Sequence, residues 1–258
     1  MTSTNLRVLC LHGFRTNCQV MESQTRGLRE ALGPKAVFVF LNGPFDARGP
    51  TDEVVERKFG ETAPFFEWWA TRELKKEEKE AIEGEEGVPN GTTKHWHLKF
   101  EDIDHAIEDM DKRLNELGEF DLAVGFSQGA AMLTILSTWC HKKGKKCWWK
   151  LVLCVCGVVP RAINVRELFE TPEGTKILVP LPSIHVVGKK DSLYKESLLL
   201  KDTYMMHSKG SPLERRLIEH DGGHKFPSPE LHHQLYMDLA NTIWQFFNNI
   251  RQSSVARM

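Results

Sequence analysis

The stretch FDLAVGFSQGA, residues 120–130, joins a short apolar run to the pattern Gly-x-Ser-x-Gly. The apolar run predicts a buried strand and the residues after the pattern predict a helix, so Ser127 falls on the turn between them. Gly125 and Gly129 lack the Cβ atoms that would clash with the adjoining strand and helix in so sharp a turn. In this context the pattern predicts a nucleophile elbow, with the Ser127 hydroxyl above the sheet edge.

A serine nucleophile needs a base, and the base needs an orienting carboxylate. Two further apolar runs follow along the chain, and each ends in polar residues. Asp191 comes shortly after the run 184–188, and His224 follows the run 217–220 and two glycines. Acidic groups just past a strand end lie on the rim where α/β sites are built. The order Ser, Asp, His therefore predicts a catalytic triad of Ser127, Asp191 and His224.

Each triad residue has a competing interpretation. Ser127 could be an ordinary helix N-cap, although an N-cap does not require glycines on both sides. Asp221 competes for the acid role, but it precedes His224 by three residues on the same loop, a poor position from which to orient that ring. His220 competes for the base role, but it falls within the strand pattern.

Two backbone N–H groups are candidates for an oxyanion hole. The Gln128 N–H stands at the N-terminus of the predicted helix, where negative charge would develop. The second donor comes from the loop after an early strand. The run 6–11 is such a strand and His12-Gly13-Phe14 follows it, so the Phe14 N–H is the donor by position. We expect His12 to brace this loop by hydrogen bonding rather than to transfer protons.

Strands and helices alternate along most of the chain. The predicted strands are 6–11, 36–41, 121–125, 150–156, 183–187 and 214–219. The predicted helices are 21–32, 101–117, 128–141, 194–207 and 229–247. This alternation predicts an α/β fold with a mostly parallel central sheet and helices on both faces. We expect one domain over residues 1–258.

The segment at about 44–99 fits no such alternation and predicts an insertion or lid after the second strand. Its charged run, Arg72–Glu86, predicts a solvated helix or a mobile loop. Its large aromatic residues are Phe65, Phe66, Trp68, Trp69 and Trp96. These rings either fill the core beneath the insertion or line an acyl pocket beside the serine. Under the second interpretation Trp68 and Trp69 bind substrate.

Three motifs together resemble the eukaryotic FSH family of serine hydrolases. They are Leu-His-Gly-Phe at 11–14, Gly-Phe-Ser-Gln-Gly-Ala-Ala at 125–131 and Gly-Gly-His-Lys-Phe-Pro at 222–227. The resemblance runs from Leu6 to about Phe247. It implies a single-domain α/β-hydrolase with esterase or thioesterase activity and no cofactor. It also places the nucleophile on Ser127, the acid on Asp191 and the base on His224.

The sequence departs from that family at two places. The segment after the second strand is long and highly charged, which leaves the substrate specificity open. Asp191 is followed by Ser-Leu-Tyr, where a more apolar turn is expected.

Composition narrows the class of protein. A net charge of −1 over 258 residues provides no long-range field for nucleic acid or an anionic membrane. No apolar stretch approaches the roughly 20 residues that span a bilayer. The N-terminus leads directly into the first strand without a secretion signal, so we expect a cytoplasmic protein whose six cysteines are reduced. We expect no metal site, because Cys140 and Cys147 lack partners at ligand spacing.

These features predict a serine hydrolase that cleaves carboxylic esters or thioesters of medium to long acyl chains. Its partner would be the small-molecule substrate, without a cofactor, and the sequence does not indicate an oligomeric state. The alternative is a ligand-binding or scaffold protein on a hydrolase fold whose chemistry has lapsed. A peptidase is disfavoured, because the length leaves no room for a separate recognition domain.

Overall fold

The computed structural model describes residues 5–85, 88–89, 91–206 and 213–255. Its centre is a six-stranded sheet in the order β10-β9-β8-β7-β1-β2, with all neighbouring strands parallel. The strands are β1 (Leu6–Leu11), β2 (Ala36–Leu41), β7 (Leu122–Phe126), β8 (Leu151–Val155), β9 (Ser183–Gly188) and β10 (Arg216–His220). The strand predictions are correct to within two residues at each end.

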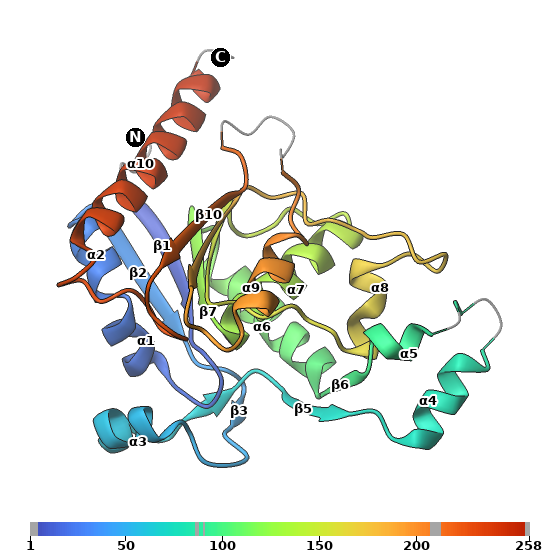
Figure 1. The fold of residues 1–258 in the computed structure, drawn as a ribbon. Helices are drawn as coiled ribbons and strands as arrows, with labels where there is room; N and C mark the ends of the chain where they lie inside the picture. Colours follow the sequence, from blue (N-terminus) through green and yellow to red (C-terminus); the bar gives the residue numbers. More distant parts are fainter. Residues whose placement is uncertain (1–4, 86–87, 90, 207–212, 256–258) are drawn as a thin grey trace.

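Helices cover both faces of this sheet (Figure 1). One face carries α1 (Cys18–Gln24), α2 (Arg26–Leu32) and α10 (His233–Val255). The other carries α6 (Ile103–Leu117), α7 (Gln128–Lys142), α8 (Arg166–Phe169) and α9 (Tyr194–Lys201). Alternate residues of β1 enter the two cores: Val8 packs with the first set of helices and Leu9 with the second. The predicted α/β fold with helices on both faces is confirmed.

Three of the helix predictions need correction. The predicted helix 229–247 runs from His233 to Val255. The predicted helix 21–32 is two helices that meet at Thr25, and the first begins earlier because Asn17 caps it. The Asn17 side-chain oxygen accepts a hydrogen bond from the Val20 N–H at 3.0 Å. The predicted helix 194–207 ends at Lys201, and residue 207 lies outside the described part of the chain.

The insertion folds as two short two-stranded antiparallel sheets, with helices between the two strands of each. The strand pairs are β3 (Phe45–Asp46) with β4 (Phe66–Glu67) and β5 (Ala70–Glu73) with β6 (Leu98–Glu101). The helices are α3 (Glu53–Phe59), α4 (Lys76–Glu83) and α5 (Thr92–His95), with a 3-10 turn at Gly60–Thr62. A second 3-10 turn, Ile163–Val165, lies outside the insertion and leads into α8. The charged run thus contains a helix, α4, one of the two forms predicted for it.

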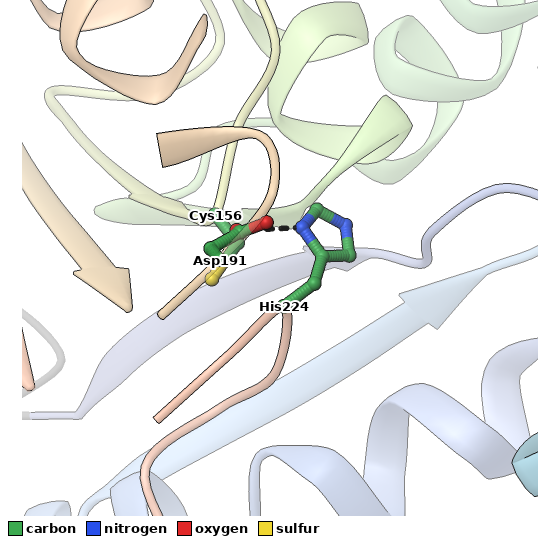
Figure 2. Close-up of side chains that lie close together, drawn as sticks. All are labelled: Cys156, Asp191 and His224. Atoms are coloured by element: carbon green, nitrogen blue, oxygen red, sulfur yellow. Dashed lines mark hydrogen bonds and ion pairs between the residues drawn. The ribbon is translucent and has the colours of Figure 1, made fainter. Parts of the chain in front are cut away.

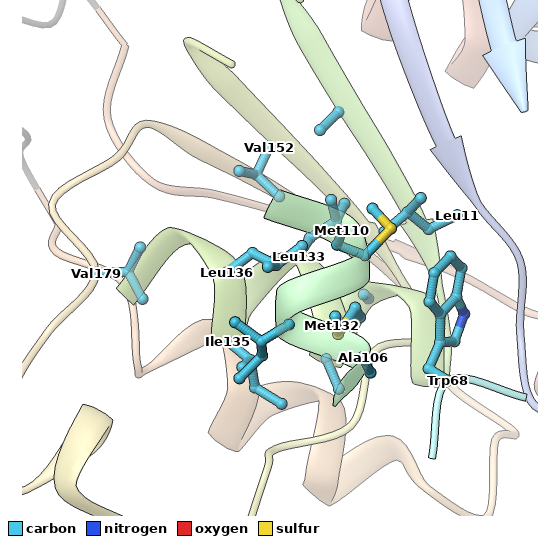
Figure 3. Packing of buried hydrophobic residues seen from close by; sticks show 14 of the residues in the cluster. Leu11, Trp68, Ala106, Met110, Met132, Leu133, Ile135, Leu136, Val152 and Val179 are labelled. Atoms are coloured by element: carbon cyan, nitrogen blue, oxygen red, sulfur yellow. The ribbon is translucent and has the colours of Figure 1, made fainter. Parts of the chain in front are cut away.

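The structure places Trp68 and Trp69 in the core rather than on an open wall. Trp68 is 0 % exposed and Trp69 is 2 % exposed. Trp68 belongs to the same cluster as Leu11 and Met110, and Figure 3 shows its ring against that cluster. The prediction that these two rings bind substrate is corrected accordingly, because the chain between β4 and β5 turns them inward and leaves almost no surface for a ligand.

Candidate active site

Ser127 stands at the junction of β7 and α7 with a strained backbone. Its φ is 51° and its ψ is −114°, a conformation that residues with a Cβ rarely adopt. The Ser127 N–H is held by the carbonyl oxygen of Val155 at 3.0 Å. Its side chain makes no capping hydrogen bond to α7, so the N-cap interpretation does not account for the hydroxyl.

The two glycines of the elbow are required by close approach. A Cβ on Gly125 would lie 2.6 Å from the Cα of Ala130. A Cβ on Gly129 would lie 2.3 Å from the carbonyl oxygen of Leu11. These contacts are with backbone atoms, which cannot move aside cheaply. The glycines therefore allow α7 to pack directly on β1 and β7 and to raise the serine at the sheet edge.

The structure brings the three predicted side chains together. His224 Nε2 lies 2.9 Å from Ser127 Oγ, and His224 Nδ1 lies 2.7 Å from Asp191 Oδ2. Figure 2 shows the contact between Asp191 and His224. Because a carboxylate can only accept, Nδ1 carries the proton and donates it to Asp191, which leaves Nε2 to accept from the serine hydroxyl. The Asp191 side chain is fully buried, and the Leu193 N–H also donates to it at 2.8 Å.

The competing residues lie elsewhere. Asp221 has a side chain 82 % exposed, and it faces Lys189 Nζ at 3.6 Å instead of the His224 ring. His220 is buried, and its Nδ1 accepts a hydrogen bond from the Gly222 N–H at 3.1 Å. Neither residue contacts Ser127 in this structure.

Cys156 lies beside the Asp191–His224 pair (Figure 2). Among the described residues these three form a group whose possible ligand atoms all lie within 4.8 Å of one another. Burial raises the pKa of the Cys156 thiol to about 12, so the sulfur is protonated at neutral pH. A metal ion here would also have to displace the hydrogen bond between His224 and Asp191. The chemistry of this group fits a proton relay beside a buried thiol better than a metal site.

Both predicted oxyanion donors are available. Phe14 follows β1 and Gln128 opens α7, so both residues lie at the sheet edge that carries Ser127. Neither backbone N–H has an acceptor within the part of the chain that the structure describes. Unpaired N–H groups beside a candidate nucleophile are the arrangement that an oxyanion hole requires.

His12 braces the loop that carries Phe14. Its Nε2 accepts a hydrogen bond from the Gly43 N–H at 2.9 Å, so its Nδ1 is the protonated nitrogen and donates to the Gly13 carbonyl at 2.7 Å. Burial lowers the pKa of His12 to about 4. A neutral, doubly hydrogen-bonded ring agrees with the expected bracing role.

The buried His12 should make the protein sensitive to mild acid. Its pKa of about 4 in the folded protein lies below the ordinary histidine value of 6.5, so the unfolded chain takes up the proton first as the pH falls. The stabilising contribution is complete above pH 6.5 and is lost between pH 6.5 and 4. At pH 5 we expect a loss of about 2 kcal/mol from this group. Urea unfolding at pH 7.5 and at pH 5 measures the total loss, to which the buried His185 also contributes, since burial lowers its pKa to about 3.

A His12→Gln variant is the control, since it removes this titration. Its unfolding free energy should fall less between the two pH values than that of the wild type. Equal slopes in the two proteins would contradict the assignment of this acid sensitivity to His12.

A family model described as serine hydrolase (FSH1) matches residues 1–235. The chain belongs to this serine hydrolase family. Esterase OVCA2 of Homo sapiens is 30 % identical over 242 residues, which cover 90 % of this chain and 94 % of that protein. Esterase FPY3 of Fusarium mangiferae is 26 % identical over 229 residues, which cover 86 % and 88 % of the two chains. The relatives are thus matched over nearly their whole length.

Solved structures support the fold. A variant of Arabidopsis thaliana SOBER1 superimposes with a TM-score of 0.52 at 12 % identity, covering 95 % of this chain and 100 % of the other. A fungal esterase from Rhizomucor miehei gives 0.52 at 11 % identity, covering 96 % and 77 %. With the parallel sheet and the elbow, these matches identify an α/β-hydrolase fold, and the family makes the chain a serine hydrolase.

Sequence reasoning missed one charged residue near the site. Glu67 has a side chain 0 % exposed and contacts Arg15, the residue after Phe14. The available signal was a single carboxylate within the aromatic run FFEWW.

Within the described residues, no helix is both long and apolar enough to cross a membrane.

Proposed function

We propose that this serine hydrolase cleaves carboxylic esters or thioesters with Ser127 as nucleophile, His224 as base and Asp191 as the orienting acid. The observation that carries the proposal is the unbroken hydrogen-bond relay from Ser127 Oγ through the His224 ring to Asp191, at 2.9 and 2.7 Å. The strained backbone of Ser127 supports it, because strain of this kind persists where function requires it.

The relay supplies both proton transfers of acyl hydrolysis. His224 Nε2 takes the hydroxyl proton as Ser127 Oγ bonds to the acyl carbon, and the carbonyl oxygen becomes an oxyanion. The oxyanion accepts hydrogen bonds from the Phe14 and Gln128 N–H groups. His224 then gives its proton to the leaving alcohol or thiol as that bond breaks. A water molecule, deprotonated by His224, repeats the sequence and releases the acid.

Asp191 stabilises the imidazolium form of His224 that arises during the reaction. Its side chain is fully buried, so water does not screen its charge from His224 when the ring is protonated. The hydrogen bond at 2.7 Å also fixes the ring orientation and keeps the proton on Nδ1. The mechanism draws on side chains and water and uses no cofactor.

We further propose medium to long acyl chains as substrates, in a cytoplasmic protein. Phe14 is 44 % exposed and follows β1, and Leu193 is 38 % exposed and follows β9, two residues after Asp191. Both thus offer apolar surface at the edge of the sheet that carries Ser127. This surface supports the acyl-chain preference, now without Trp68 and Trp69 as pocket walls.

Acyl-chain length tests this proposal. Each methylene buried on such surface adds about 0.8 kcal/mol to transition-state binding. We therefore expect kcat/KM for p-nitrophenyl octanoate to exceed that for the acetate by about tenfold or more. A parallel series of acyl-CoA thioesters compares sulfur with oxygen as the leaving atom.

The Ser127→Ala variant supplies the background rate for both series. A preference for acetyl over octanoyl esters would contradict the acyl-chain proposal and leave the hydrolase mechanism standing. Binding of these esters without any Ser127-dependent turnover would instead favour a lapsed, ligand-binding protein.

A further inference from the structure

The insertion contacts Gln128 and the loop that carries Phe14, and these two places supply the proposed oxyanion donors. Its chain from Phe66 to Trp69 runs past the loop after β1 and past the start of α7. The Phe66 N–H donates to the Thr16 carbonyl at 2.7 Å, which forms an isolated antiparallel bridge between the insertion and the oxyanion loop.

Glu67 is the charged centre of this contact. Its side chain is 0 % exposed, and its Oε2 accepts a hydrogen bond from Arg15 Nε at 3.1 Å. Its Oε1 lies 3.4 Å from Arg48 Nε and accepts no hydrogen bond from the described residues. Burying a carboxylate costs free energy unless cations face it, and Arg15 and Arg48 both face Glu67.

Arg15 transmits this constraint to Phe14. The Arg15 backbone has a φ of 52°, in the left-handed region that non-glycine residues seldom occupy. Its guanidinium carbon lies 4.6 Å from the centroid of the Phe14 ring, and its Nη1 donates a hydrogen bond to the Pro50 carbonyl at 3.3 Å. Arg15 is therefore held from the side of Glu67 and Pro50 while it covers Phe14.

The next residues of the insertion hold the other donor. The Gln128 side chain accepts a hydrogen bond from the Trp68 N–H at 3.2 Å and donates one to the Trp69 carbonyl at 2.9 Å. The Trp68 indole N–H donates to the His12 carbonyl at 2.9 Å, two residues before Phe14. One short segment thus fixes both sides of the proposed oxyanion hole.

We propose that Glu67 is a positioning residue for the oxyanion hole, and that it acts through Arg15 on the Phe14 N–H. This inference rests on the proposed hydrolase function. The aromatic segment of the insertion then has a role although its rings are buried. The backbone of this segment and the Glu67 carboxylate align the two oxyanion donors. Oxyanion stabilisation depends on donors fixed in advance of the reaction, so loosening one should slow the chemical step more than it weakens substrate binding.

The test is Glu67→Gln, which keeps the shape of the side chain and removes its charge. Loss of a whole oxyanion donor typically costs about 10²–10³ in turnover, so a displaced donor should lower kcat by about tenfold. We expect KM to stay within about twofold, since the loss concerns the transition state. Affinity for a trifluoromethyl ketone, whose adduct with the serine carries an oxyanion, should fall in parallel with kcat. The pH midpoint of kcat should not move, because the His224–Asp191 pair is untouched.

Glu78→Gln is the matched control. Glu78 lies in the same insertion and pairs with Arg72 at 2.6 and 2.7 Å, without a described contact to the oxyanion loop. It should retain the wild-type kcat and ketone affinity. Arg15→Met is the second variant. The Arg15 side chain is 23 % exposed, and Glu67 still faces Arg48 when Arg15 is replaced. It should reproduce the loss in kcat and decides the matter if Glu67→Gln does not fold.

The outcomes separate the two proposals. Wild-type protein without Ser127-dependent turnover would overturn the hydrolase mechanism itself. An active wild type whose folded Glu67→Gln or Arg15→Met variant keeps kcat and ketone affinity would overturn the role of Glu67 alone. A rise in KM at unchanged kcat would also overturn it, since that result indicates a substrate contact.

Discussion

Replacing Ser127 with alanine should lower ester turnover by about 10⁴-fold or more while the protein stays folded. The substitution removes the atom that bonds to the acyl carbon. It should cost little stability, because the one hydrogen bond found for Ser127 Oγ in the described chain goes to His224 and none caps α7. Alanine also meets the positive φ with the same Cβ that serine has.

Turnover of p-nitrophenyl octanoate and labelling by a fluorophosphonate measure the effect of Ser127→Ala, with a thermal melt to confirm folding. Labelling should be lost together with turnover. An alanine variant that keeps wild-type turnover would assign the nucleophile elsewhere, since no base or donor can replace the missing bond to carbon.

Asp191→Asn should lower kcat by about 10⁴-fold. An asparagine amide at this position can donate to His224 Nδ1, which moves the ring proton to Nε2. The ring then cannot accept the proton of Ser127. The loss arises from the wrong tautomer, so substrate affinity should change far less than kcat.

Asp221→Asn is the matched control for the acid. Its side chain is exposed and faces Lys189 at 3.6 Å, so its loss should leave kcat close to the wild-type value. Initial rates of both variants over pH 6–9 are compared with those of the wild type. An inactive Asp221→Asn beside an active Asp191→Asn would transfer the acid role to Asp221.

Much of the fold was predictable because its signals are local. A buried strand is an apolar run bounded by turn residues, and the elbow requires glycine at fixed offsets from the serine, as the backbone contacts of Gly125 and Gly129 show. The order of Ser127, Asp191 and His224 at successive strand ends also follows from sequence, because parallel strands place those ends on one edge. The structure has these three side chains in contact, and their catalytic roles await the variants above.

The insertion was predicted least well, for a physical reason. The sequence alone determined that the chain is an α/β-hydrolase with an elbow serine and that an aromatic segment interrupts its pattern. Only tertiary structure decided that Trp68 and Trp69 point into the core and that Glu67 meets Arg15, which is 52 residues away. Glu67 ends a two-residue strand, and Trp68 and Trp69 form the two-residue connection to the next one. Which side chains of such short segments turn inward depends on the surface they pack against, and no local periodicity records that surface.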